Sequence, residues 1–229
     1  MRISEIFFSI QGEGKLFGIP SAFIRTTGCN LRCTWCDTPY ASWTPEGEDM
    51  TIDAILDRIA PYPTRFVVLT GGEPLLQNDV VELTRRLRDD GRHITIETAA
   101  TVYKPVMCDL ASLSPKLANS TPLARDGGKF AEAHERDRFQ PDVIEAFIRT
   151  APDFQLKFVV EREQDLEEID RMLQRLPDVP RENVLLMPEG TEAASLLERG
   201  RWVAETCKSR GFRYCPRLHV ELFGCCRGV

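Results

Sequence analysis

Short apolar segments rich in β-branched residues recur along the chain at intervals typical of buried strands. Six such segments lie at residues 21–25, 65–69, 93–97, 110–114, 155–160 and 183–187. Each is almost continuously apolar, which is typical of strands covered on both faces in a parallel sheet. The pattern therefore predicts six parallel strands.

Between these strands the apolar positions change to the 3.6-residue period of amphipathic helices. These positions are Ile52, Ile55, Leu56 and Ile59 in the first helix, Val80, Leu83, Thr84 and Leu87 in the second, and Leu166, Ile169 and Leu173 in the third. Thr51 is the expected N-cap of the first helix, Asn78 or Asp79 opens the second, and Gly91 ends it. A fourth helix is expected from Thr191 to near Gly211.

Strands that alternate with helices predict a partial (βα)6 parallel barrel in which some helices are abbreviated. Chemistry in such a barrel lies at the C-terminal ends of the strands. No linker or repeat divides the chain, so we expect a single domain over residues 1–229. Residues 118–140 are polar and interrupt the rhythm, which favours a partly helical surface insertion and a candidate lid.

Composition and charge narrow the function class. The chain has 229 residues and a net charge of −6, which argues against general binding to nucleic acid or to a membrane surface. No apolar run approaches the length of a bilayer span, and Met1–Ile10 does not resemble a signal peptide. We therefore expect a cytoplasmic enzyme. The eight cysteines are spaced poorly for a disulfide framework, so a metal or redox role is favoured.

Three cysteines, Cys29, Cys33 and Cys36, fall within eight residues just after the first predicted strand. Thiolates suit either zinc or an iron–sulfur cluster. A structural zinc site would need a distant fourth ligand, such as Cys207, Cys215 or a histidine. Three ligands on a four-iron cluster would instead leave one iron open for a ligand. Spacing alone leaves both readings open.

The CxxxCxxC spacing, with Trp35 before the last cysteine and "TGGEP" after the second strand, resembles the radical S-adenosylmethionine superfamily. Alone, GGEP is equally typical of a plain β-to-helix turn. The stretches "SIQGEG", "FIRTTGCNLRCTWCDT", "LTGGEPLLQ", "IETAAT" and "LSPKL" together resemble the 7-carboxy-7-deazaguanine synthase family. The resemblance covers nearly the whole chain and is less informative at 118–140 and in "FGCCRGV". Cys225 and Cys226 are unexpected in that family, and we interpret them as incidental thiols.

The resemblance implies a [4Fe–4S] cluster on Cys29, Cys33 and Cys36 whose open iron binds S-adenosylmethionine. The implied contacts of S-adenosylmethionine are Trp35, Cys36, Asp37, Gly72, Ser114, Pro115, Lys116, Met187, Pro188, Glu189 and Gly190. Thr38 is implied to bind Mg²⁺, although its position also suits a turn or a helix cap. Glu97–Thr98 ends a strand and is a further candidate contact, with a structural ion pair as the alternative for Glu97.

The implied substrate is 6-carboxy-5,6,7,8-tetrahydropterin, a flat ring that carries a carboxylate. Its implied contacts are Ile10, Gln11, Gly12, Arg25, Thr70, His219 and Val229. Arg25 lies inside an apolar run where an unpaired guanidinium is costly, so a protein carboxylate is an equal alternative to a substrate anion. A lone late histidine such as His219 is also often simply packed.

The implied reaction is a ring contraction that depends on S-adenosylmethionine and Mg²⁺. It gives 7-carboxy-7-deazaguanine, releases ammonia and belongs to queuosine or deazapurine biosynthesis. It implies an external electron donor such as flavodoxin or ferredoxin, a homodimer, and chain ends that cap the substrate. A glycyl-radical enzyme activase or another radical enzyme is the nearest alternative function. A non-catalytic zinc-binding module is the alternative from another class.

Overall fold

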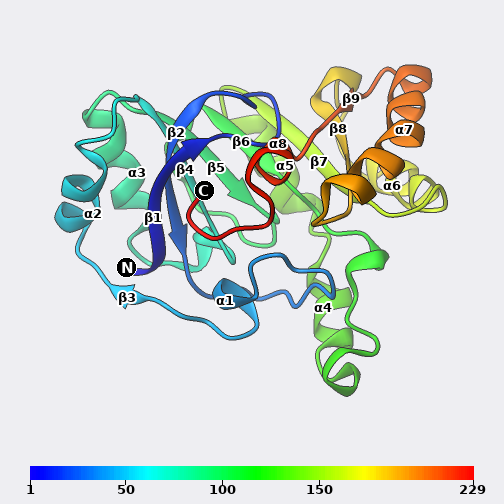
Figure 1. The fold of residues 1–229 in the computed structure, drawn as a ribbon, viewed down its shortest axis with the longest axis horizontal. Helices are drawn as coiled ribbons and strands as arrows, with labels where there is room; N and C mark the ends of the chain where they lie inside the picture. Colours follow the sequence, from blue (N-terminus) through cyan, green and yellow to red (C-terminus); the bar gives the residue numbers. More distant parts are fainter.

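The computed structural model describes residues 1–229 and contains one nine-stranded sheet in the order β3-β1-β2-β4-β5-β6-β7-β8-β9 (Figure 1). The strands are β1 (Arg2–Ile10), β2 (Pro20–Thr26), β3 (Glu48–Asp49), β4 (Phe66–Gly71), β5 (His93–Thr98), β6 (Leu110–Leu113), β7 (Phe154–Val160), β8 (Val184–Pro188) and β9 (Arg213–Tyr214). Strands β2 and β4 to β9 run parallel, whereas β1 pairs antiparallel with both of its neighbours, β2 and β3. The edge strands do not pair with each other, so the predicted partial parallel barrel is confirmed.

All six predicted strands are present, each within two residues of its predicted bounds. The sequence analysis missed β1 and the two-residue edge strands β3 and β9. In β1 only Ile3 is fully buried, because this antiparallel strand lies near the sheet edge and faces the cavity with part of its length. A strand with so mixed an environment lacks the continuous apolar pattern that identified the others.

Eight α-helices accompany the sheet. They are α1 (Pro39–Ser42), α2 (Ile52–Ile59), α3 (Val80–Asp89), α4 (Ala131–Asp137), α5 (Pro141–Thr150), α6 (Asp165–Leu173), α7 (Ala193–Arg210) and α8 (Leu218–Phe223). Thr51 caps α2 by accepting the Ala54 N–H, and Gly91 and Gly211 follow α3 and α7 with positive φ, as predicted. The sequence pattern did not predict α5 or α8. No helix separates β5 from β6, so the expected abbreviation is confirmed.

The two faces of the sheet differ in chemistry because side chains alternate along each strand. One face packs on the helices and forms the main core, for example through Ile24, Leu69 and Ile96. The next residues along the same strands, Arg25, Thr70 and Glu97, lie on the other face and line a cavity. Helices α2 and α3 lie beside one half of the sheet, and α6 and α7 lie beside the other (Figure 1). The sheet therefore presents a polar inner face to the site.

Residues 118–140 contain α4 and two short 3₁₀ turns, which confirms a partly helical segment. The segment supports the loop at residues 27–38, which carries the three clustered cysteines and is called the cysteine loop. Thr34 N–H donates to Ser120 O at 2.8 Å, and Arg32 N–H donates to His134 Nδ1 at 3.1 Å. None of its residues lines the cavity. The expectation of a lid is therefore wrong, and the segment is a support for the loop.

The C-terminal tail, residues 215–229, folds back across the sheet and ends near its middle (Figure 1). The Leu218 N–H donates to Gly12 O at 2.9 Å, so α8 is attached to the loop that follows β1. Arg227 pairs with Glu5 and Glu46 and lies over the Tyr40 ring. Both chain ends thus contribute to one region. No helix combines the length and the apolar character that crossing a bilayer requires.

Candidate active site

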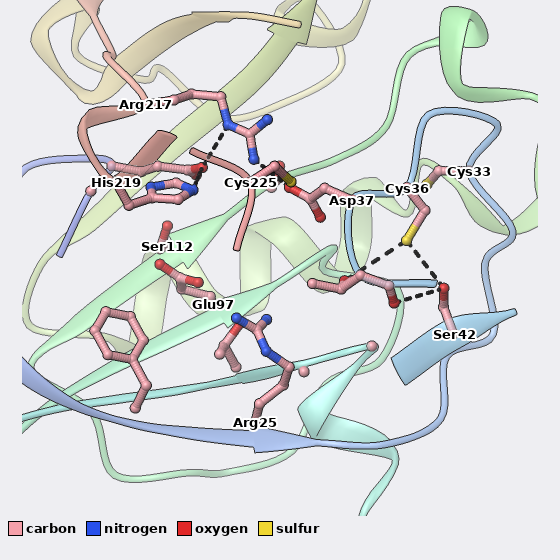
Figure 2. Close-up of a pocket in the computed structure, with 18 of the residues that line it drawn as sticks. Arg25, Cys33, Cys36, Asp37, Ser42, Glu97, Ser112, Arg217, His219 and Cys225 are labelled. Atoms are coloured by element: carbon pink, nitrogen blue, oxygen red, sulfur yellow. Dashed lines mark hydrogen bonds and ion pairs between the residues drawn. The ribbon is translucent and has the colours of Figure 1, made fainter. Parts of the chain in front are cut away.

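A cavity of about 310 Å³ lies at the C-terminal ends of the parallel strands, where the barrel rule places chemistry. Figure 2 shows Cys33 and Cys36 at one end of this cavity and His219 at the other, with Arg25 and Glu97 on the floor between them. Of the predicted site residues, those that line the cavity are Ile10, Gln11, Gly12, Arg25, Cys29, Cys33, Trp35, Cys36, Asp37, Thr38, Thr70, Gly72, Ser114, Lys116, Met187, His219 and Val229.

The three clustered cysteines all face this cavity from the loop between β2 and α1. Cys33 packs with Leu31 and Ala99 in a small apolar cluster. Burial raises the pKa of Cys29 and of Cys33 to about 12, although Lys116 acts in the opposite direction on both. Because metal ligation requires thiolates, binding of a positively charged metal centre would have to displace these protons.

The donor set fits an iron–sulfur cluster better than a single metal ion. No three His, Cys, Asp or Glu side chains in the structure lie close enough together to hold one ion. The proposed distant ligands for zinc are also used elsewhere: Cys207 is part of the main core, and Cys215 Sγ accepts the Gly14 N–H. Three thiols spread around one cavity instead suit a cluster that spans them and leaves one iron open.

The GGEP turn is braced directly against the cysteine loop. Glu73 N–H donates to Gly28 O at 2.8 Å. A Cβ on Gly72 would overlap with Gly28 O and lie 2.6 Å from Ala41 O, so only glycine permits this approach. The Glu73 carboxylate is fully buried and accepts hydrogen bonds from Thr98 Oγ1 and from the Ala99 and Leu75 N–H groups. It is not on the cavity wall, so it supports the backbone there and does not face a cation.

Four predicted contacts of S-adenosylmethionine, Pro115, Pro188, Glu189 and Gly190, do not line the cavity. Glu189 pairs with Arg199, and Gly190 O accepts a hydrogen bond from Arg217. By contrast, Lys116 and Ser114 do face the cavity. Lys116 Nζ donates to Ser114 O at 2.7 Å and to Ser114 Oγ at 2.9 Å, which fixes the ammonium beside the strand end.

Thr38 occupies the N-cap position of α1, but its side chain makes no capping hydrogen bond. Its Oγ1 lies 3.8 Å from Cys36 Sγ, and the residue lines the cavity. The alternative of a turn or helix cap is therefore confirmed for the position of Thr38, because Thr38 O accepts the Ala41 N–H at 2.9 Å, although its hydroxyl does not take part in the cap. The Thr38 hydroxyl thus has the Cys36 thiol as its one side-chain partner and lies at the cavity wall.

Arg25 has the carboxylate partner that the sequence analysis considered. Its Nε donates to Glu5 Oε1 at 2.7 Å, and Tyr40 OH donates to the same oxygen at 2.9 Å. No protein group accepts from the two terminal nitrogens of Arg25, although the residue lines the cavity. The alternative of a protein carboxylate is therefore confirmed for one edge of the guanidinium, and the substrate anion stays a prediction for the other edge.

The loop after β1 lies opposite the cysteines. Gln11 Nε2 donates to Glu97 Oε1 at 2.9 Å, and Glu97 has no cation within ion-pair distance. A Cβ on Gly12 would overlap with the His219 ring, so this glycine permits the tail to pack on the loop. Burial lowers the pKa of His219, although the nearby Glu13 partly opposes this shift. The lowered pKa favours the neutral imidazole, which has one N–H donor and one nitrogen acceptor.

A buried charge network beside this loop was missed by the sequence analysis. Glu13 pairs with Lys157 from β7 and with Arg217 from the tail, and Arg217 also pairs with Asp37. Although burial alone would raise it, the Lys157 and Arg217 cations hold the pKa of Glu13 well below its ordinary value. The lysine within the apolar strand "QLKFVV" was the available signal, because a buried ammonium requires a partner.

Aromatic side chains form another part of the wall that was not predicted. Phe7 and Phe23 stack with ring centroids 4.8 Å apart and an angle of 5° between the planes. Both line the cavity, and Arg25 lies 5.8 Å from the Phe7 centroid. A flat aromatic surface beside hydrogen-bonding groups suits a planar heterocycle.

Cys225 and Cys226 are exposed, yet both line the cavity together with Arg227, Gly228 and Val229. Figure 2 shows Cys225 on the tail segment next to Asp37. The tail thiols therefore belong to the wall of the site, and the sequence analysis had no signal for this placement.

Comparisons with known proteins agree with this geometry. The Radical SAM superfamily model matches residues 23–119. A protein from Rhodopirellula baltica named 7-carboxy-7-deazaguanine synthase is 46% identical over 227 residues, covering 99% of this chain and 88% of that protein. One of the same name from Halobacterium salinarum is 45% identical, covering 96% and 90%. The crystal structure of QueE from Escherichia coli matches with a TM-score of 0.71 at 28% identity, covering 95% of this chain and 94% of that chain.

Proposed function

Because this chain belongs to the 7-carboxy-7-deazaguanine synthase family of radical S-adenosylmethionine enzymes, we propose that it contracts the ring of 6-carboxy-5,6,7,8-tetrahydropterin. The products would be 7-carboxy-7-deazaguanine and ammonia, which makes the enzyme a carbon–nitrogen lyase of deazapurine biosynthesis. The observation that carries the proposal is one cavity that joins three free thiols to a polar and aromatic floor. The relatives' shared name favours neither an activase nor a zinc module.

We propose that Cys29, Cys33 and Cys36 hold a [4Fe–4S] cluster and that S-adenosylmethionine lies beside Trp35, Gly72, Ser114, Lys116 and Met187. When bound, this pair supplies the electron transfer and carbon–sulfur bond cleavage that start the reaction. The protein contributes orientation and exclusion of water. The apolar packing around Cys33 would help to exclude water, and the turn at Gly72 would help to orient S-adenosylmethionine.

The remaining cavity residues would bind the pterin. The free edge of Arg25 faces the cavity and suits the substrate carboxylate, because a guanidinium binds such a group through two parallel hydrogen bonds. Glu97, Gln11 and neutral His219 offer acceptors and donors for the ring edge, and the Phe7–Phe23 stack offers an apolar surface. The carboxylate of Val229 would complete the edge contacts from the tail.

We propose Mg²⁺ as a further cofactor on the Thr38 hydroxyl. Magnesium favours few protein ligands and takes the rest of its oxygen shell from substrate and water. The Thr38 hydroxyl lies at the cavity wall and makes no capping hydrogen bond, which supports this placement. We further propose that an external one-electron donor such as flavodoxin or ferredoxin reduces the cluster and that the protein forms a homodimer. We also propose that the chain is a single domain whose two ends act as extensions that cap the substrate.

The direct test is anaerobic reconstitution followed by an assay with the carboxypterin, S-adenosylmethionine, a reductant and Mg²⁺. We expect a new ultraviolet-absorbing deazaguanine and an equal amount of ammonia, with lower turnover when Mg²⁺ is chelated. The Cys33→Ala variant is the control, because it should lose both the cluster and the product. A holoprotein with an intact cluster that forms no deazaguanine would exclude the proposed reaction, and zinc without iron or sulfide would exclude the cluster.

A further inference from the structure

Arg217 is a buried side chain that contacts three separate segments of the active site. It is 6% exposed and lies immediately before α8. Its Nε donates to Glu13 Oε1 at 3.2 Å, one terminal nitrogen donates to Gly190 O, and the other pairs with Asp37. Figure 2 shows Arg217 at the edge of the cavity, between His219 and Asp37. All three guanidinium nitrogens are therefore used, each on a different segment.

The three partners belong to the loops that build the site. Glu13 lies in the loop at residues 11–19 between β1 and β2, called the substrate loop because it contains proposed pterin contacts. Asp37 directly follows the cysteine Cys36, and Gly190 follows β8. Glu13 has a second cation, Lys157, that would hold it without the tail. The Asp37 carboxylate has no protein partner other than Arg217, although its side chain is 39% exposed. The Asp37 carboxylate therefore depends on Arg217 for its only charge partner, whereas the Glu13 carboxylate does not.

The residues that follow Arg217 fix the tail at the same place. Leu218 N–H donates to Gly12 O, and the His219 ring occupies the space that a side chain on Gly12 would need. Residues 217–219 thus form a continuous clasp between the tail and the substrate loop. Because a planar guanidinium bonds in three directions at once, a lysine ammonium at this position would not satisfy all three partners.

We infer that Arg217 is a positioning residue that couples closure of the C-terminal tail to alignment of the cysteine loop. As a result, S-adenosylmethionine is cleaved productively only when the tail is packed in place. The inference rests on the proposed function for its chemical part, whereas the clasp itself rests on geometry alone. Neither the relatives' names nor the sequence motifs assign a role to Arg217.

The test compares Arg217→Lys with wild-type holoenzyme by hydrogen exchange and by product analysis. We expect amides of residues 218–223 to exchange about tenfold faster in the variant, because the tail opens locally more often. With substrate present, the ratio of 5′-deoxyadenosine to deazaguanine should rise about tenfold, because an open site admits water and competing hydrogen donors. Each abortive cleavage takes one electron to break the carbon–sulfur bond. It takes a second electron and a proton from the reductant and solvent to complete 5′-deoxyadenosine.

Arg210→Lys is the matched control, because Arg210 pairs with Asp170 and does not line the cavity. It should keep wild-type exchange at 218–223 and the wild-type ratio. Wild-type exchange in Arg217→Lys would overturn the clasp, and faster exchange with an unchanged ratio would overturn the coupling. If wild-type enzyme forms no deazaguanine, the proposed function fails, while the exchange measurement still decides whether Arg217 holds the tail.

Discussion

Arg25 has one structural contact and one free edge in the cavity. The sequence indicated that a guanidinium in an apolar run needs an anion, and the structure provides Glu5 for one edge only. The sequence could not predict which carboxylate this is, because Glu5 lies on β1, a strand that was itself not recognised. The arginine itself indicated that an anion must lie nearby. The identity of that anion depended on the pairing of β1 with β2, which places Glu5 opposite Arg25.

Because one edge of Arg25 is free, we expect the loss of Arg25 and the loss of its partner Glu5 to have different effects on substrate binding. Arg25→Gln removes the positive charge, and we expect the KM for the carboxypterin to rise about 100-fold, as for loss of one partner of a desolvated charge pair. Glu5→Gln keeps an acceptor for Nε, so KM should change less than about fivefold. Steady-state kinetics of both variants measure the difference. Equal increases in KM would mean that Arg25 acts only through Glu5.

His134 predicts a pH dependence of stability. Its Nδ1 accepts the Arg32 N–H, so its Nε2 carries the proton and donates to Ser120 Oγ. Burial lowers the pKa of His134 from 6.5 to about 4. The unfolded chain therefore takes up a proton near pH 6.5 while the folded protein does not. As a result, stability is complete above this pH and is lost as the pH falls toward 4.

The His134→Asn variant removes this titration. We expect its free energy of unfolding to fall less steeply with decreasing pH than that of wild type, by at most about 1.4 kcal/mol per pH unit. Urea unfolding of the cluster-free protein across this pH window measures both slopes. His219 remains in both proteins and cancels in the comparison. Identical slopes would contradict a neutral, buried His134.

At the scale of the elements, the sequence predicted the parallel strands well and their inner face poorly. The nearly continuous apolar runs suggested burial on both faces, yet Arg25, Glu97 and Lys157 lie among apolar neighbours and face the cavity. Register explains how these residues meet: Arg25 pairs with Thr70, and Glu97 pairs with Ser112, on neighbouring strands. A single strand sequence does not contain that register, so the cavity floor required the structure.

Helix ends were predictable because their signals are local. Thr51, Gly91 and Gly211 act where the sequence placed them. The role of residues 118–140 was not predictable from the sequence. Their support of the cysteine loop depends on the hydrogen bond from Arg32 N–H to His134 Nδ1, and these two residues are far apart in the sequence. Polarity indicated an exposed segment, but its inner surface is held by buried Ser120 and His134.

The contact between the GGEP turn and the cysteine loop predicts different effects for two glycines. Gly72→Ala would force Gly28 O and Ala41 O away, so we expect loss of most cluster iron with the fold retained. Gly91→Ala strains a positive φ after α3 in open space and should cost about 1 kcal/mol of stability without loss of iron. Iron analysis and urea unfolding of both variants test this contrast. Full iron content in Gly72→Ala would show that the two loops can separate without harm.

At the scale of the whole molecule, both chain ends contribute residues to the wall of the candidate active site. The Glu13–Arg217 pair joins residues 204 positions apart, and Arg227 reaches back to Glu5 on β1. Short motifs identified the family, and the relatives that span nearly the whole chain confirm that assignment. They did not reveal the charge network, because no local pattern connects the loop after β1 to the tail.

The tail beyond α8 predicts a last effect, on substrate affinity. Removal of residues 224–229 takes away Arg227 and Val229 but leaves Arg217 and His219 in place. Because the removed residues are exposed, the free energy of unfolding should change by less than about 1 kcal/mol. The KM for the carboxypterin should rise about tenfold, while kcat changes less, because the proposed substrate contacts of the tail end are lost while Arg217 still holds Asp37.

Arg227→Gln separates the anchor of the tail from its end. It removes the ion pairs with Glu5 and Glu46 but keeps the Val229 carboxylate, so KM should rise less than in the truncated protein. If truncation left KM unchanged, the tail end would only cover the cavity and would make no contact with substrate. If Arg227→Gln equalled the truncation, the anchor would account for the whole effect, because an unanchored Val229 would then contribute nothing to binding.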